Sequence, residues 1–197
     1  LSLSESGRHA ADGVFSEGPL AVAVVTADCL PILMSSRDGR VVAALHGGWQ
    51  GLVAGIVGAA VARFNARGVA SADIRVAIGP GIKACCYEVS AGFIEALQVG
   101  HGRLWEGAVP PWSQRRPLPE RPPRFAPPEP RQAEQGAWLD LVAFCRQLFQ
   151  AAGVGPAQIE ASAVCTYCSG DAFASHRRRQ RLGEEKRQQY AWIARKP

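Results

Sequence analysis

Two apolar runs separated by a tight turn constrain the fold of this chain more than any other feature. The runs are residues 20–34 (LAVAVVTADCLPILM) and 40–45 (RVVAAL), and both are rich in aliphatic and β-branched side chains. Between them, residues 36–39 read SRDG, and the glycine can take the positive φ that hairpin turns favour. The pattern predicts a hairpin of buried strands.

In this predicted hairpin, Cys29 lies directly opposite His46 on the same face, with Cβ atoms about 5 Å apart. A thiol and an imidazole at that spacing suit two ligands of one metal ion, or a cysteine nucleophile with its histidine base. Gly47 and Gly48 then let the backbone turn away and leave room beside the imidazole for a substrate. In a regular strand Asp28 points to the opposite face, so we expect it to hold backbone or a neighbouring side chain and not the metal.

The rest of the chain mixes helix and strand patterns without a strict βαβ rhythm, which favours an α+β sandwich with mixed sheets over a doubly wound sheet. The patterns predict helices at residues 52–65, 90–98 and 138–152, strands at 74–78, 159–165 and 190–193, and a polar loop or short strand over the segment CTYCSGDAFASHRR.

Proline is concentrated in one segment, because nine of the fourteen prolines fall within residues 109–130. Such a segment cannot form a helix or a central strand. It predicts an extended insertion loop at about 107–135 within one domain that spans residues 1–197. Loops of this composition usually only connect neighbouring elements. The alternative is that the segment is a ligand for a domain that recognises proline-rich motifs.

Six cysteines, no signal peptide pattern at the start and no long apolar run together predict a cytoplasmic protein with free thiols and no membrane span. Cys85 and Cys86 are adjacent, while Cys165 and Cys168 form a single C-x-x-C without a second one to complete a zinc ribbon.

The net charge of +5 is concentrated in residues 176–197. A solvated basic face explains this tail, and no aromatic-rich motif supports binding of nucleic acid.

Four ordered strings resemble the bacterial laccase-domain family of purine nucleoside phosphorylases, also labelled polyphenol oxidoreductases: TADCLPILM, LHGGWQGL, IGPGIKACCYEVS, and CTYC followed by FASHRR. The resemblance implies an α/β sandwich with mixed sheets, similar to the catalytic domain of cytotoxic necrotizing factor. It implies cytosolic phosphorolysis of adenosine and inosine, with a purine nucleoside and phosphate as the substrates. Adenosine deamination and phosphorolysis of methylthioadenosine are further implied activities.

The family's zinc is bound by His, Cys and His, of which Cys29 matches the cysteine and His46 the second histidine. The first histidine, in a Gln-Val-His-Gly segment, has no counterpart here, so we expect a laccase domain that is incomplete at its amino terminus and a third ligand upstream of this chain. The residues expected to bind substrate are Gly47, Gly48, Gln50, Cys86, His176 and Arg177. The family usually has Arg at the position of Gln50, and glutamine lacks the charged, bidentate donor that suits phosphate.

Three other functions remain open on the sequence. Four histidines are too few for a conventional multicopper oxidase, but a single copper site that oxidises phenols is compatible with one Cys and one His. A metal-free hydrolase would use Cys29 as nucleophile and His46 as base. A non-catalytic binding module would explain the missing ligand and the proline-rich insertion. The sequence does not specify the oligomeric state.

Overall fold

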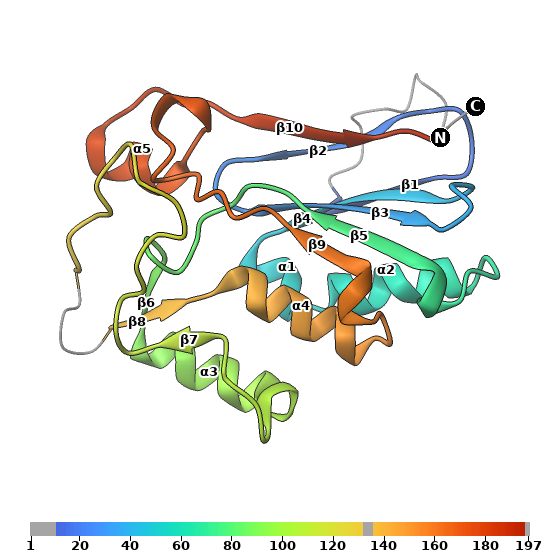
Figure 1. Cartoon of the computed structure of the whole chain (residues 1–197), viewed down its shortest axis with the longest axis horizontal. Coiled ribbons are helices and arrows are strands. Elements are labelled where there is room, and N and C mark those ends of the chain that lie inside the picture. The colour runs from blue at the N-terminus through green and yellow to red at the C-terminus, as the bar shows by residue number, and fades with distance from the viewer. Residues whose placement is uncertain (1–10, 132–135, 196–197) are drawn as a thin grey trace.

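The computed structural model describes residues 11–131 and 136–195, which form a layered sandwich (Figure 1). A five-stranded sheet in the order β1-β4-β3-β5-β9 lies in the middle. Its pairs are antiparallel except for β5 and β9, so the sheet is mixed. The expectation of an α+β sandwich with mixed sheets is confirmed.

The strands are β1 (Gly13–Ser16), β2 (Val22–Thr26), β3 (Leu30–Ser36), β4 (Val42–Gly47), β5 (Ile74–Ile78), β6 (Glu88–Ser90), β7 (Trp112–Ser113), β8 (Gly136–Leu139), β9 (Ile159–Ala161) and β10 (Gln189–Ile193). The α-helices are α1 (Trp49–Val53), α2 (Ile56–Asn65), α3 (Ala91–His101), α4 (Leu141–Ala151) and α5 (His176–Leu182).

The five-stranded sheet is covered on both faces. Helices α1, α2 and α4 cover one face, and the β10-β2 pair covers the other (Figure 1). Because side chains alternate along a strand, Ile32 and Met34 pack into the core under the helices, while Leu33 packs against Val22 and Val24 of the outer pair. A third sheet, β6-β8-β7, lies beside α3 at one end of the molecule.

The predicted first strand is two strands. The residue that separates them is Asp28, with φ of 82°, a left-handed conformation that aspartate tolerates better than most residues. After this break β2 pairs with β10, and β3 pairs with β4 in a register that places Pro31 opposite His46. The predicted register, with Cys29 opposite His46, is therefore wrong by two residues.

Other predicted boundaries also change at specific residues. Gly55, with φ of 89°, divides the predicted helix 52–65 into α1 and α2. Asp140 accepts a hydrogen bond from the backbone of Ala143 and caps α4, so Trp138 belongs to strand β8 and not to the helix. The segment expected to be a loop or strand after Cys165 contains helix α5, which Ser175 caps. Strand β5 matches its prediction in full.

The proline-rich segment has no helix or strand from residue 114 to residue 130. It crosses the end of the molecule as a loop, and the backbone N–H groups of Arg124 and Phe125 both donate to the carbonyl of Cys168. Residues 132–135, the last part of the expected insertion, lie outside the described residues. No helix within the described parts of the chain is long and apolar enough to cross a membrane.

Candidate active site

The turn at Asp28 positions the residues around it. Its buried carboxylate accepts three hydrogen bonds: from the hydroxyls of Thr166 (2.6 Å) and Ser175 (3.0 Å) and from the backbone N–H of Arg177 (2.6 Å). Burial raises the pKa of Asp28, and the three donors oppose that shift. Asp28 thus joins the segment that carries Cys29 to the start of α5. The sequence analysis expected such a role, in which Asp28 holds backbone or neighbouring side chains.

Cys29 and His46 lie together although the predicted register is wrong. Cys29 directly precedes β3, and His46 is the next-to-last residue of the neighbouring strand β4. A Cβ atom added at Gly48 would lie 3.2 Å from the sulfur of Cys29 and 3.8 Å from Nε2 of His46. Sulfur and Nε2 therefore face the same small space, which Gly48 leaves open.

Asp12 orients the imidazole from the opposite side. Its carboxylate lies 3.0 Å from Nδ1 of His46, which leaves Nε2 directed toward Cys29. A hydrogen bond with Cys29 raises the pKa of His46 to about 9; burial opposes this shift, and the bond to Asp12 adds to it. A carboxylate behind a histidine fixes its tautomer and ring position, whether the other nitrogen binds a metal or takes a proton.

A half-open pocket of about 490 Å³ lies in front of this pair. The volume falls in the range of roughly 300–1,000 Å³ that is common for small-molecule sites. One part of the lining is cationic and comes from α5 and the segment after it: Arg177, Arg179, Lys186 and Arg187. Another part is aromatic or aliphatic: Trp49, Ile82, Tyr87 and Leu141.

Arg177 and Tyr87 connect the two parts of the lining. The guanidinium of Arg177 lies 5.2 Å from the centre of the Tyr87 ring and donates to the carbonyl of Glu88 at 3.2 Å. Burial raises the pKa of Tyr87 to about 12, so the phenol is neutral at physiological pH. These contacts hold a fixed positive charge over an aromatic ring.

The predicted site residues fall into two groups. Four of them line the pocket: Cys29, His46, His176 and Arg177. The other four lie outside its lining: Gly48 borders the Cys29–His46 space, Gly47 packs against Ile32 and Leu30, Gln50 is exposed on α1, and Cys86 is fully buried elsewhere. Arg178, the residue after Arg177 in the basic tail, is 1% exposed and points into the protein.

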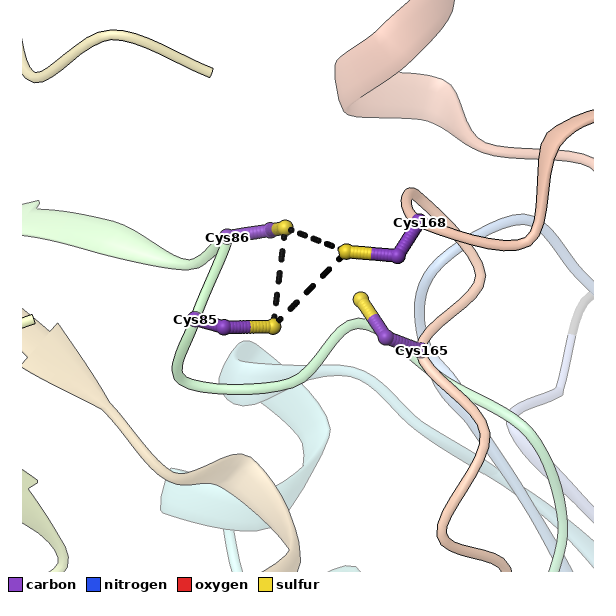
Figure 2. A group of neighbouring side chains, drawn as sticks. All are labelled: Cys85, Cys86, Cys165 and Cys168. Carbon is purple, nitrogen blue, oxygen red and sulfur yellow. Dashed lines mark hydrogen bonds between the residues drawn. The ribbon is translucent and has the colours of Figure 1, made fainter. Parts of the chain in front are cut away.

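Two features of the structure, one at this site and one outside it, were not predicted from the sequence. Asp12 lies in a region without a clear pattern, and only the pairing of β1 with β4 brings it to His46. The second feature is a buried group of four thiols, Cys85, Cys86, Cys165 and Cys168, which could hold a metal ion because their sulfur atoms all lie within 4.8 Å of one another (Figure 2). The C-x-x-C therefore does have partners, in the adjacent pair 80 residues earlier.

The Cys29–His46 space fits part of a zinc site. Thiolate sulfur and an imidazole nitrogen backed by a carboxylate are usual zinc donors, and Gly48 leaves their shared space unfilled. Among residues 11–131 and 136–195, no third His, Cys, Asp or Glu joins this pair in a compact ligand group. His176 lines the same pocket, His101 packs against Phe144, and His9 lies outside the described residues.

A family model described as multi-copper polyphenol oxidoreductase laccase matches residues 2–193. The chain belongs to this family. Among its relatives, the laccase-family chain is 35% identical to "Purine nucleoside phosphorylase YlmD" of Geobacillus stearothermophilus over 85% of its own length and 54% of that protein. It is 33% identical to "Adenosine deaminase RL5" from an unknown prokaryotic organism, over 81% of the chain and 53% of that protein.

Solved structures agree with this assignment. The crystal structure of YlmD from Geobacillus stearothermophilus matches with a TM-score of 0.74 and 31% identity, over 94% of the laccase-family chain and 61% of the other. A Bacillus licheniformis protein, YfiH, matches with a TM-score of 0.72 and 30% identity, over 95% and 62% of the two chains. The chain spans about half the length of the curated relatives that it matches.

Substitution of Asp12 by Ala is expected to weaken the site without disturbing the fold. The carboxylate is exposed and its described contact is with His46, so its loss frees the imidazole to rotate. Loss of such a partner typically costs about 10- to 100-fold in metal affinity or activity. The affinity for added zinc measures the effect, and Asp73→Asn, at an exposed carboxylate beside Arg37, is the control. Equal zinc affinity in Asp12→Ala and wild type would contradict the role given to Asp12.

Gly48→Ala tests the open space between Cys29 and His46. The backbone at Gly48 (φ −74°, ψ 157°) accepts alanine, but the new methyl would lie 3.2 Å from the sulfur of Cys29. We expect weaker binding of added zinc with little change in melting temperature. Gly51→Ala is the control, because the nearest atom to its methyl would be 3.5 Å away. Unchanged binding of added zinc by Gly48→Ala would show that no ion occupies this space.

Proposed function

We propose that the chain provides the catalytic domain of a zinc-dependent purine nucleoside phosphorylase that acts on inosine and adenosine. The observation that carries the proposal is the pair of Cys29 and His46 in a pocket whose lining, or wall, is partly cationic and partly aromatic or aliphatic. The printed names of the relatives, purine nucleoside phosphorylase and adenosine deaminase, both describe enzymes of purine nucleosides.

The cationic wall suits phosphate. Arg177, Lys186 and Arg187 line the pocket, whereas its buried carboxylate, Asp28, is already engaged by three donors. An arginine held in place by a ring and a carbonyl presents its remaining N–H groups in a fixed direction, which favours binding of an oxyanion. This wall also offers an alternative to the arginine that Gln50 replaces.

The aromatic wall suits the nucleoside base. Trp49 is 40% exposed and is held edge-on to Phe93 at 5.1 Å between ring centres, so its indole is rigid but accessible. Together with Tyr87 and Leu141 it gives the flat apolar surface on which a purine ring packs. Phosphate and ribose C1′ would then meet between the two walls.

In the proposed reaction a phosphate oxygen forms a bond to ribose C1′ while the bond from C1′ to the purine nitrogen breaks. The products are ribose 1-phosphate and, once the departing nitrogen has taken a proton from solvent, free base. Arg177 and its cationic neighbours would orient the phosphate and balance its charge. Cys29 and His46 would hold zinc, which supplies a Lewis acid beside the reacting groups. Deamination of adenosine, and phosphorolysis of methylthioadenosine, are further reactions proposed for the same pocket.

The test is incubation of the purified chain with inosine, with and without phosphate, while hypoxanthine is measured by chromatography. The expected result is hypoxanthine release that requires phosphate, falls on removal of zinc and returns when zinc is added. Copper in place of zinc, with oxidation of phenols and no release of base, would support a polyphenol oxidase instead. No reaction with inosine, adenosine or methylthioadenosine would contradict the proposal.

A metal-free hydrolase is a second candidate because one observation favours it. Cys29, His46 and Asp12 form a chain of thiol, imidazole and carboxylate, which is the order of nucleophile, base and orienting group in cysteine hydrolases. Hydrolysis that persists in a zinc chelator and stops on alkylation of Cys29 would favour this candidate. Activity that chelation abolishes would exclude it.

A further inference from the structure

Four cysteine sulfurs meet in the interior at one place, and their spacing is that of ligands around one ion (Figure 2). The distance between sulfurs is 3.6 Å for Cys85 and Cys86, 3.9 Å for Cys85 and Cys168, and 3.3 Å for Cys86 and Cys168. Four sulfurs at the zinc–sulfur distance of roughly 2.3 Å in a tetrahedron lie about 3.8 Å apart. A disulfide needs about 2.05 Å, so the sulfurs are spaced as separate thiols.

The backbone around the thiols is fixed from several directions. Thr166 donates its backbone N–H to the carbonyl of Gly81, which ties the C-x-x-C turn to the segment that leads into Cys85. The backbone N–H of Cys168 donates to the sulfur of Cys165. Cys85, Cys86, Cys165 and Cys168 are 2%, 0%, 7% and 5% exposed. The thiols are therefore arranged before any ion arrives.

Positive charge surrounds the cluster. Four thiolates around a divalent ion carry a net charge of about −2, which is costly in the interior unless cations lie close by. Arg178 donates to the carbonyls of Thr166 and Tyr167 within the C-x-x-C turn, and Arg116 donates to the carbonyl of Cys85 at 2.8 Å. Lys83, two residues before Cys85, is 7% exposed.

The proline-rich segment closes over the same cluster. Arg116 binds the carbonyl of Cys85, and the backbone N–H groups of Arg124 and Phe125 donate to the carbonyl of Cys168 at 2.8 and 3.1 Å. The ring of Phe125 packs against Gly170, and the guanidinium of Arg178 lies 5.4 Å from its centre. The segment is thus attached at both halves of the cluster and keeps water from the thiols.

We propose that Cys85, Cys86, Cys165 and Cys168 bind one structural zinc ion as four thiolates. Binding releases the four thiol protons to solvent and forms four zinc–sulfur bonds, with no change in oxidation state. Four sulfur ligands in tetrahedral spacing suit zinc, and the closed site leaves no position for substrate. The ion would hold the turn that carries Thr166, and hence Asp28, behind the pocket.

The test uses the full chain with Cys29→Ser, which removes the proposed ligand in the pocket and leaves the buried thiols intact. After reduction, chelation and titration with zinc, we expect one equivalent bound per chain, and zinc X-ray absorption with four sulfur neighbours at about 2.3 Å. Cobalt in place of zinc should give the intense visible absorption of a tetrahedral thiolate site. Cys145→Ala, at a buried cysteine outside the cluster, should not change either result.

Cys86→Ser and Cys168→Ser, each added to Cys29→Ser, should lose the bound equivalent and the cobalt spectrum. The X-ray absorption result needs no cluster variant, so it decides the proposal even where these variants fail to fold. Nitrogen or oxygen neighbours around zinc, no bound ion, another metal, or a disulfide in freshly purified protein would each overturn it. Failure of the phosphorylase assay alone leaves this outcome unaffected, because the test protein lacks Cys29.

Discussion

Cys29→Ser is expected to abolish zinc binding in the pocket and to lower kcat/KM for inosine by more than the roughly 100-fold that loss of an orienting partner costs. The reason is that Cys29 is one of the two proposed zinc donors that the described residues bring together, and a serine hydroxyl is a far weaker ligand at neutral pH. Steady-state kinetics with zinc present in excess measure the effect. The hydrogen bond that raises the pKa of His46 is lost as well.

The matched control is Cys145→Ala, at a fully buried thiol of α4 that faces only apolar neighbours. It should retain its zinc and most of its activity, although stability falls slightly because a sulfur atom leaves the core. If Cys29→Ser retains normal kcat/KM, the pocket residues do not act as proposed. If it loses activity but a zinc-free wild type does not, Cys29 acts as a nucleophile.

Arg178→Met is expected to cause the largest loss of stability, about 3–5 kcal/mol, because it removes a buried guanidinium that pairs with the partly exposed Glu184 and leaves buried backbone carbonyls without donors. Arg178 is 1% exposed and pairs with Glu184 at 2.6 Å. It also donates to the backbone carbonyls of Thr166, Tyr167 and Phe173. Urea denaturation followed by circular dichroism measures the change in the free energy of unfolding.

Arg179→Met is the matched control for this prediction, since it removes the same charge from the next position of the same helix. The Arg179 guanidinium contacts His176 at 3.4 Å at the surface, so its loss should change stability by no more than about 0.5 kcal/mol. Equal effects of the two substitutions would show that charge and not the buried contacts of Arg178 determines stability here.

The sequence predicts most strands and helices of this fold, but not the single residues at which a strand or a helix is interrupted. Apolar runs predict strands at β3, β4 and β5, and the serine cap predicts α3, because burial and capping are local properties. The breaks at Asp28 and Gly55 depend on single residues with positive φ, and an unbroken apolar pattern on both sides conceals them. The boundary between β8 and α4 escapes for a similar reason, since buried strand and buried helix look alike there.

Cys29 lies beside His46 as the sequence predicts, although the strand register behind that prediction is wrong. The hairpin exists, but its register differs by two residues. The pair still meets because Cys29 directly precedes β3, His46 lies near the end of the neighbouring strand β4, and both side chains lie beside Gly48. The pocket as a whole was not predictable, because its cationic wall comes from α5 and the segment after it. Only the tertiary fold brings that segment to the turn at Asp28.

The thiol cluster was not predictable from the sequence. Neither the adjacent cysteines nor the C-x-x-C has the spacing of a known metal motif by itself. They meet through a single parallel bridge between Gly81 and Cys165, which has no signature in residue type. The basic tail was expected to be a solvated face, because arginine usually lies at the surface. Arg178 departs from this expectation, since it is fully buried.

Strand β2 has one hydrogen-bonded neighbour in the described sheets, and that neighbour is β10, with Val22 aligned to Ile193. Strand β2 therefore leaves the ribosome long before its hydrogen-bonded neighbour β10 is synthesised. Val22 and Val24 can pack on Val42 and Ala44 of the central sheet early, but the backbone of β2 has no partner strand until residues 189–193 follow. The outer layer is thus completed only after residue 193 has left the ribosome, and nascent chains stalled before residue 189 should be bound by chaperones or aggregate.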